Sequence, residues 1–208
     1  MADALERWQA FTCRLTLPPE RAATLYVELE NHYGEAHRHY HTLPHILDML
    51  DGRDALGADG FALEAAIWCH DVIYDPRSGE NERNSAEFAA EGFSSIEDPE
   101  FHSDLERLIV VTDHRDPPTM DDERIICDLD LMILGRNAES YRAYTEAIRK
   151  EFSHVPDDLY SKARRSVLQA FLDRPTIYHM EPMRDQFEEA ARRNLESELE
   201  ELAAGDST

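Results

Sequence analysis

Apolar residues recur at helical spacing in the first part of the chain. Between residues 3 and 15 they follow the 3.6-residue period of an α-helix, at Leu5, Trp8, Phe11 and Leu15. The pair Pro18–Pro19 then opens a second predicted helix that runs to about Asn31, because proline is favoured in a first helical turn. Both segments therefore predict amphipathic helices.

The same periodicity predicts eight further helices. They are expected at residues 44–50, 61–74, 84–92, 99–111, 121–134, 138–152, 157–172 and 184–202. The segment at 61–74 is mostly apolar and is expected at the centre of the fold. The glutamate-rich stretch at 187–202 spaces opposite charges for solvent-facing pairs, which is typical of a surface helix.

Strand signals are weak throughout the chain. The two β-like runs, "LIVV" and "RIICDLDLMIL", lie inside longer helical patterns, and there is no internal repeat, low-complexity linker or interior boundary. The sequence therefore predicts an all-α fold, a single-domain helical bundle over residues 1–208. Its core is expected at about 20–175, with a C-terminal surface helix at about 184–202.

Polar residues interrupt three otherwise apolar segments. In "AIWCHDVIYD" the interruption is His70 and Asp71, and in "ICDLDLMILG" it is Asp128 and Asp130. The stretch "NHYGEAHRHYHTLPHI" holds five of the ten histidines, namely His32, His37, His39, His41 and His45. The three segments thus carry imidazoles and carboxylates at positions where the pattern predicts burial.

A metal centre satisfies these polar groups together. Buried carboxylates are costly unless they are paired or coordinate a metal, and these segments contain little Lys or Arg. We expect imidazole ligands from His45 and His70 and carboxylate ligands from Asp71 and Asp128. Mixed nitrogen and oxygen ligands suit manganese, iron, cobalt, nickel and zinc.

The number of ions and the role of His41 stay open at this stage. Adjacent helical residues diverge by about 100°, so either His70 and Asp71 straddle one ion or Asp71 bridges two. His41 and His45 share a helix face if the helix begins before Pro44; otherwise His41 lies on the entering loop.

Structural explanations exist for each polar residue taken singly. A histidine such as His70 is more often hydrogen-bonded in a core than bound to metal, and Asp128 or Asp130 could cap a helix. Surface positions account for His32, His37 and His39. The ordered set on separate apolar segments nevertheless favours the metal interpretation.

The charge of the chain restricts its partners. The formal net charge of the 208 residues is −23. Such a chain repels polyphosphate backbones, which argues against nucleic-acid polymers and anionic membranes as partners. A small anionic substrate is compatible with this charge if a local cation, such as a bound metal, offsets the field.

Composition also indicates a compartment. No apolar run approaches the roughly 20 residues of a membrane span, and the acidic start lacks the features of a secretion signal. The three scattered cysteines form neither a disulfide framework nor a CxxC pattern: Cys13, Cys69 and Cys127. We therefore expect a cytoplasmic protein with buried thiols.

The ordered polar residues resemble a known family. His45, the pair His70–Asp71 and Asp128 are similar to the metal-ligand signature of the HD-domain metal-dependent phosphohydrolases. The strings "HRHYHTLPHILDML", "AIWCHDVIYDPRSGENERNSA" and "DLDLMILG" resemble one bacterial branch, usually described as predicted HD superfamily hydrolases. The resemblance covers about residues 32–174.

The resemblance implies an all-helical fold of the HD-domain type and hydrolysis of phosphomonoesters or phosphodiesters, often of nucleotides. It carries the ligand roles over to His45, His70, Asp71 and Asp128. The implied cofactor is a divalent ion, with magnesium, manganese, iron, cobalt, nickel and zinc as candidates. The implied partner is a small phosphorylated substrate, with a nucleotide favoured.

The resemblance also suggests catalytic roles. The string from Tyr40 to His45 is similar to the start of the cyclic-nucleotide phosphodiesterase site, which makes His41 the candidate general acid. Glu82 is a candidate water-orienting base, weighed evenly against a solvated carboxylate at a helix start, and Asp71 is counted as catalytic as well as a ligand. The expected substrate contacts are Arg38, which lies between two histidines, Arg136 and Asp130.

Two alternatives remain on the same fold. If His114 holds a second metal, the site is dinuclear and a di-iron oxygenase becomes an option. The other alternative is a non-catalytic binding or sensor protein that retains the fold. The sequence leaves the substrate, the metal and a homo-oligomeric state undetermined.

Overall fold

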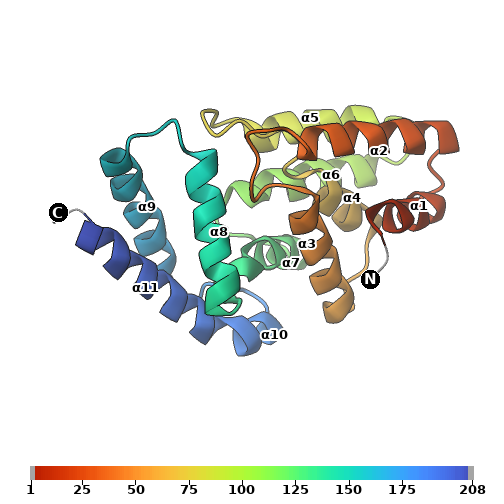
Figure 1. Ribbon diagram of the computed structural model, residues 1–208. Coiled ribbons are helices and arrows are strands. Elements are labelled where there is room, and N and C mark those ends of the chain that lie inside the picture. The colour runs from red at the N-terminus through yellow and green to blue at the C-terminus, as the bar shows by residue number, and fades with distance from the viewer. Residues whose placement is uncertain (1–2, 206–208) are drawn as a thin grey trace. The chain divides into compact units, whose positions relative to one another are not determined.

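Helices are the regular elements of the computed structural model, which describes residues 3–205 (Figure 1). Within this range the chain forms no β-strand, which confirms the predicted all-α class. None of the described helices is long and apolar enough to cross a membrane. Contacts along the chain divide it into two units, at residues 1–127 and 128–208.

The first unit contains six complete α-helices in the described range and most of a seventh. They are α1 (Ala4–Arg14), α2 (Pro19–Tyr33), α3 (Leu43–Leu56), α4 (Phe61–Cys69), α5 (Asn81–Gly92), α6 (Pro99–Val110), the short 3-10 helix η1 (Val111–Asp113) and α7 (Asp121–Asp130). The unit boundary falls inside α7, after Cys127. The sequence carries no linker at this point.

The second unit begins with the last residues of α7. It continues through the 3-10 helix η2 (Leu131–Gly135), α8 (Ala138–Glu151), α9 (Asp157–Leu172), α10 (Glu181–Met183), the π-helix η3 (Arg184–Glu188) and α11 (Glu189–Gly205). Helix α11 packs along α9. One face of residues 187–202, which the sequence predicts at the surface, is buried. That face carries Phe187, Ala191, Leu195 and Glu198.

Several helix ends differ from the sequence prediction: α5 begins at Asn81 rather than residue 84, α7 ends at Asp130 rather than residue 134, and α11 begins at Glu189 rather than residue 184. The ends of α3 and α4 differ most. Helix α3 runs past residue 50, where we expected it to end, and ends at Leu56. Its C-cap is Gly57, whose φ of 62° suits the left-handed conformation that glycine tolerates. Helix α4 ends at Cys69 rather than near Tyr74. A turn follows it at once, in which the Val72 amide donates to the Cys69 carbonyl at 3.0 Å.

Helix α4 lies at the centre of the first unit, as its apolar sequence predicted. Its residues from Ala65 to Cys69 have no exposed surface. The Trp68 ring meets Trp8 of α1 edge to face, with ring centroids 5.3 Å apart. The buried position of α4 fixes the place where the chain emerges into the His70–Asp71 turn.

The buried carboxylate of Glu123, in the first unit, predicts how the stability of the protein changes at acid pH. The Glu123 side chain accepts hydrogen bonds from the Thr119 and Met120 amides at 2.6 and 3.0 Å and from Arg107 at 3.1 Å. Burial raises the pKa of Glu123, but these hydrogen bonds more than compensate and lower it from 4.5 to about 2.

We therefore expect Glu123→Gln to cost about 3 kcal/mol of unfolding free energy near neutral pH. Because the folded pKa is depressed, this stabilisation is present above pH 4.5 and is lost as the pH falls toward 2. Urea unfolding at pH 6 and at pH 3 measures the difference between variant and wild type, which should shrink at pH 3. The exposed Glu106→Gln serves as the control, and an equal loss at both pH values would contradict the prediction.

Candidate metal centre

Two imidazole nitrogens and one carboxylate oxygen converge in the first unit. The Nε2 atoms of His45 and His70 lie 3.3 Å apart. The Asp71 Oδ2 atom lies 3.0 Å from His70 Nε2 and 3.8 Å from His45 Nε2. Both histidines are buried, and Asp71 is half-buried. Three of the four expected metal ligands are thus brought together.

The ends of two helices place these groups. Helix α3 begins at Leu43 with Pro44 in its first turn, so His45 points from that turn and His41 lies on the loop before the helix. This settles the position of His41 that the sequence left open. His70 is the C-cap of α4, and Asp71 is the first residue beyond it.

Hydrogen bonds to the other ring nitrogens orient both imidazoles. His70 Nδ1 lies 3.1 Å from the Ile67 carbonyl, and because a carbonyl only accepts, this nitrogen carries the proton. The Nε2 atom of the same ring then faces His45 Nε2 and Asp71 Oδ2. His45 Nδ1 is hydrogen-bonded to the Tyr40 hydroxyl at 3.1 Å. Metal-binding histidines are typically held in this way by a partner at the second nitrogen.

The spacing of the three atoms fits a divalent ion. Two nitrogen or oxygen ligands about 2.1 Å from one ion, at angles of 90–110°, lie about 3.0–3.4 Å apart. The two shorter distances in the site, 3.3 and 3.0 Å, fall in this range. A lone pair and a carboxylate at such distances repel each other unless a cation or a shared proton lies between them. The group can therefore hold a metal ion.

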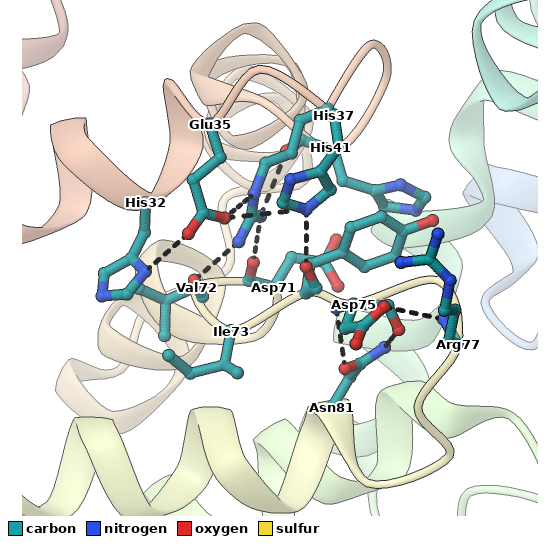
Figure 2. Close-up of polar contacts among 12 residues, drawn as sticks. His32, Glu35, His37, His41, Asp71, Val72, Ile73, Asp75, Arg77 and Asn81 are labelled. Atoms are coloured by element: carbon teal, nitrogen blue, oxygen red, sulfur yellow. Dashed lines mark hydrogen bonds and ion pairs between the residues drawn. The ribbon is translucent and has the colours of Figure 1, made fainter. Parts of the chain in front are cut away.

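His41 lies beside this group. Its ring stacks on Tyr74 with centroids 4.2 Å apart, and its centroid is 6.3 Å from that of His45. The ring of His37 is parallel to Tyr74 within 8°, and His37 Nε2 lies 2.8 Å from the Tyr74 carbonyl. Figure 2 shows His37 and His41 above the loop that leads from Asp71 toward Asp75. The imidazole proposed as a general acid is thus held next to the ligand group.

Glu82 lies in the first turn of α5 and is half-buried. Burial raises its pKa, and the negative charges of Asp71 and Asp113 raise it further, against the opposing effect of Arg115. The influence of Asp71 shows that Glu82 lies within electrostatic reach of the ligand group. A carboxyl group with a raised pKa next to such a site is suited to accept a proton.

Arg38 occupies a different environment from the one expected of a phosphate ligand. Its side chain has no exposed surface. Its guanidinium donates to the backbone carbonyls of Asp71 at 2.6 Å and Val72 at 2.8 Å. Arg38 therefore contacts the protein backbone rather than a space open to substrate.

Asp128 also differs from its expected environment. Its carboxylate is fully buried in the second unit and accepts from the His179 amide at 2.8 Å and the Met180 amide at 2.7 Å. Burial raises its pKa to about 6, although these two amides lower it. Both oxygens of Asp128 thus accept backbone amides of the residues just before α10.

The remaining expected residues take varied positions. Asp130 ends α7 and is half-buried. The guanidinium of Arg136 lies over the Phe187 ring, 5.6 Å from its centroid, within the second unit. His114 closes η1 with a φ of 55°, and among the described residues it does not belong to the group of converging ligand atoms.

Two residues that support the site, Asn81 and Ser85, were not identified from the sequence. Asn81 and Ser85 lie four apart on α5, and both bond to the loop after the metal ligands. Asn81 accepts from the Asp75 amide and donates to the Asp75 carbonyl, both at 3.0 Å (Figure 2). Ser85 accepts from the Ile73 amide at 3.0 Å. The four-residue spacing of Asn81 and Ser85 in "NERNS" was the feature of the sequence that could have identified them.

Comparisons with protein-family models, with curated proteins and with solved structures found no match. The likeness to the HD-domain phosphohydrolases therefore stays a prediction that rests on the residues themselves.

The geometry predicts about one bound divalent ion per chain. We expect His70→Ala to weaken metal binding by more than the about 10–100-fold typical of losing an outer-shell partner. Titration calorimetry with Mn²⁺ and elemental analysis of the purified protein measure this loss. His102→Ala is the control, because His102 is half-buried and bonded to a backbone carbonyl at 2.8 Å. Equal metal content in wild type and His70→Ala would refute the site.

Proposed function

We propose that this protein is a divalent-metal-dependent phosphohydrolase that cleaves a phosphomonoester or phosphodiester of a small substrate, with a nucleotide as the favoured class. The observation that carries the proposal is the convergence of His45 Nε2, His70 Nε2 and Asp71 Oδ2 beside a stacked imidazole, His41. The likeness of the sequence motifs to HD-domain hydrolases supports the reaction type.

The proposed ligands within the first unit are His45, His70 and Asp71, each of which can offer one ligand atom. Asp128 is left out of this set because both of its oxygens already accept backbone hydrogen bonds. Nitrogen and oxygen donors of this kind suit manganese, iron, cobalt, nickel or zinc.

A divalent ion held there supplies two effects: it lowers the pKa of a coordinated water and offsets negative charge on a phosphoryl group. The chain supplies the proton transfers. Glu82, whose pKa is raised, accepts a proton from the attacking water. His41, held against Tyr74, donates a proton to the leaving oxygen.

Exposed arginines near the site are the proposed phosphate contacts. Arg38 is excluded from this role by its burial, whereas Arg77 and Arg115 are exposed. Arg115 donates to the Gly79 carbonyl at 2.9 Å and lowers the pKa of Glu82, so it lies in the same region. Arginine binds phosphate through paired donors, which suits this task in a protein of net charge −23.

The di-iron alternative gains no support from the site. It needs further histidine ligands, and His114 lies outside the converging group in the described chain. No observation specifically favours the non-catalytic sensor alternative either. The candidate general acid His41 and the candidate base Glu82 both lie near the ligands, as a catalytic site requires.

The first functional prediction concerns Asp71→Asn, which keeps the shape of the side chain and removes its charge. We expect at least about a 100-fold loss of phosphohydrolase kcat/KM, because a charged metal ligand is replaced by a neutral one. A panel of nucleotides and simple phosphoesters with Mn²⁺, Co²⁺ and Mg²⁺ measures it. The control is Asp75→Asn, an identical change at an exposed position four residues later. Unchanged hydrolysis by Asp71→Asn would refute the proposal.

The second functional prediction concerns His41→Gln. We expect a fall of about 10²–10⁴-fold in kcat for an alkyl phosphoester, since a general acid contributes on this scale. The fall should be smaller for a nitrophenyl ester, because that leaving group needs no proton. Metal affinity should stay within about threefold, as His41 is outside the ligand group. His37→Gln is the control, and equal losses on both esters would contradict the acid role.

A further inference from the structure

Arg38 is a fully buried arginine in the histidine-rich segment. Its side chain has no exposed surface, although the residues on both sides, His37 and His39, are exposed. A guanidinium is always charged, and its burial is costly unless its donors are satisfied. The hydrogen-bond partners of Arg38 therefore indicate its structural role.

One side of the guanidinium bonds to the turn that carries the metal ligands. Its Nη1 donates to the Asp71 carbonyl at 2.6 Å, and its Nη2 donates to the Val72 carbonyl at 2.8 Å. These carbonyls lie just past the end of α4, where the helix no longer provides amide partners. Arg38 thus fixes the backbone from which the Asp71 carboxylate projects.

The other contacts hold Arg38 to its own segment. Its Nε donates to Glu35 at 2.9 Å, and its Nη1 also donates to the His41 carbonyl at 3.3 Å. Figure 2 shows Glu35 facing His32 on one side and the loop of His37 and His41 on the other. One side chain therefore bonds both to the loop that precedes His45 and to the turn of His70 and Asp71.

Two aromatic rings complete the environment. The guanidinium carbon lies 5.3 Å from the centroid of Tyr33 and 5.4 Å from that of Tyr74. Tyr74 in turn stacks on His41. The contacts of Arg38 thus reach both a proposed metal ligand and the proposed general acid.

We propose that Arg38 is a positioning residue that aligns the two halves of the metal centre, the His41–His45 segment and the His70–Asp71 turn. The inference rests on the metal centre of the proposed function. Lysine cannot replace it, because an ammonium has no planar set of donors that reaches three carbonyls and a carboxylate at once. An ammonium has only three donors, so a lysine would leave at least one of these four acceptors unsatisfied.

The test compares Arg38→Lys with Arg53→Lys in Co²⁺ titrations followed by visible absorption. Arg53 is also buried and is ion-paired with Glu64, so its replacement controls for a general loss of stability. We expect Arg38→Lys to weaken Co²⁺ binding by at least about tenfold, as for outer-shell partners of metal ligands. We also expect a changed absorption spectrum of the bound ion. Arg53→Lys should keep the wild-type spectrum and affinity even if its urea midpoint falls equally.

A second variant tests the inference if Arg38→Lys does not fold. Glu35→Gln removes the carboxylate that holds Nε, at a position that is only half-buried. We expect it to weaken Co²⁺ binding by about threefold to tenfold, below the loss for a whole outer-shell partner. Wild-type affinity and spectrum in Glu35→Gln, and in Arg38→Lys where it folds, would overturn the inference alone. A wild type that binds no Co²⁺ would overturn the metal centre and this inference with it.

Discussion

The first unit is organised around the convergence of two imidazoles and a carboxylate in its interior. His45, His70 and Asp71 come from two helix ends, and their ligand atoms face one another at 3.0–3.8 Å. Desolvated polar groups at such distances are unfavourable unless each is bonded or a cation lies among them. The hydrogen bonds of the Nδ1 atoms, to the Ile67 carbonyl and the Tyr40 hydroxyl, leave the two Nε2 atoms facing inward.

Buried charge is handled differently elsewhere in the chain. Glu64 of α4 pairs with Arg14 and Arg53, and Glu123 pairs with Arg107. At the candidate metal centre, by contrast, the carboxylate of Asp71 faces imidazoles, and the nearby buried arginine bonds to the Asp71 backbone. Glu64 and Glu123 therefore face guanidinium groups, whereas Asp71 faces two imidazole nitrogens, a set of groups that can also hold a metal ion.

The two carboxylates of α7, Asp128 and Asp130, show a limit of predicting residue roles from a sequence motif. Asp128 and Asp130 stand two residues apart in the same apolar run, and the pattern could not rank them. In the structure Asp128 accepts from the His179 and Met180 amides, some 50 residues later in the chain. No local pattern predicts which backbone amides will reach a carboxylate over that separation. Arg38 is a parallel case, because its carbonyl partners at Asp71 and Val72 are set by packing.

The sequence alone determined the all-α class, most helix boundaries and the buried position of α4, because these follow from local periodicity, caps and apolar content. It also selected His45, His70 and Asp71, since polar residues in apolar segments are conspicuous. Only the tertiary structure decided which carboxylates cap backbone amides and which arginine faces protein rather than solvent. Those outcomes depend on contacts between distant segments, and a hydrogen bond forms only where packing brings its donor within about 3 Å of its acceptor.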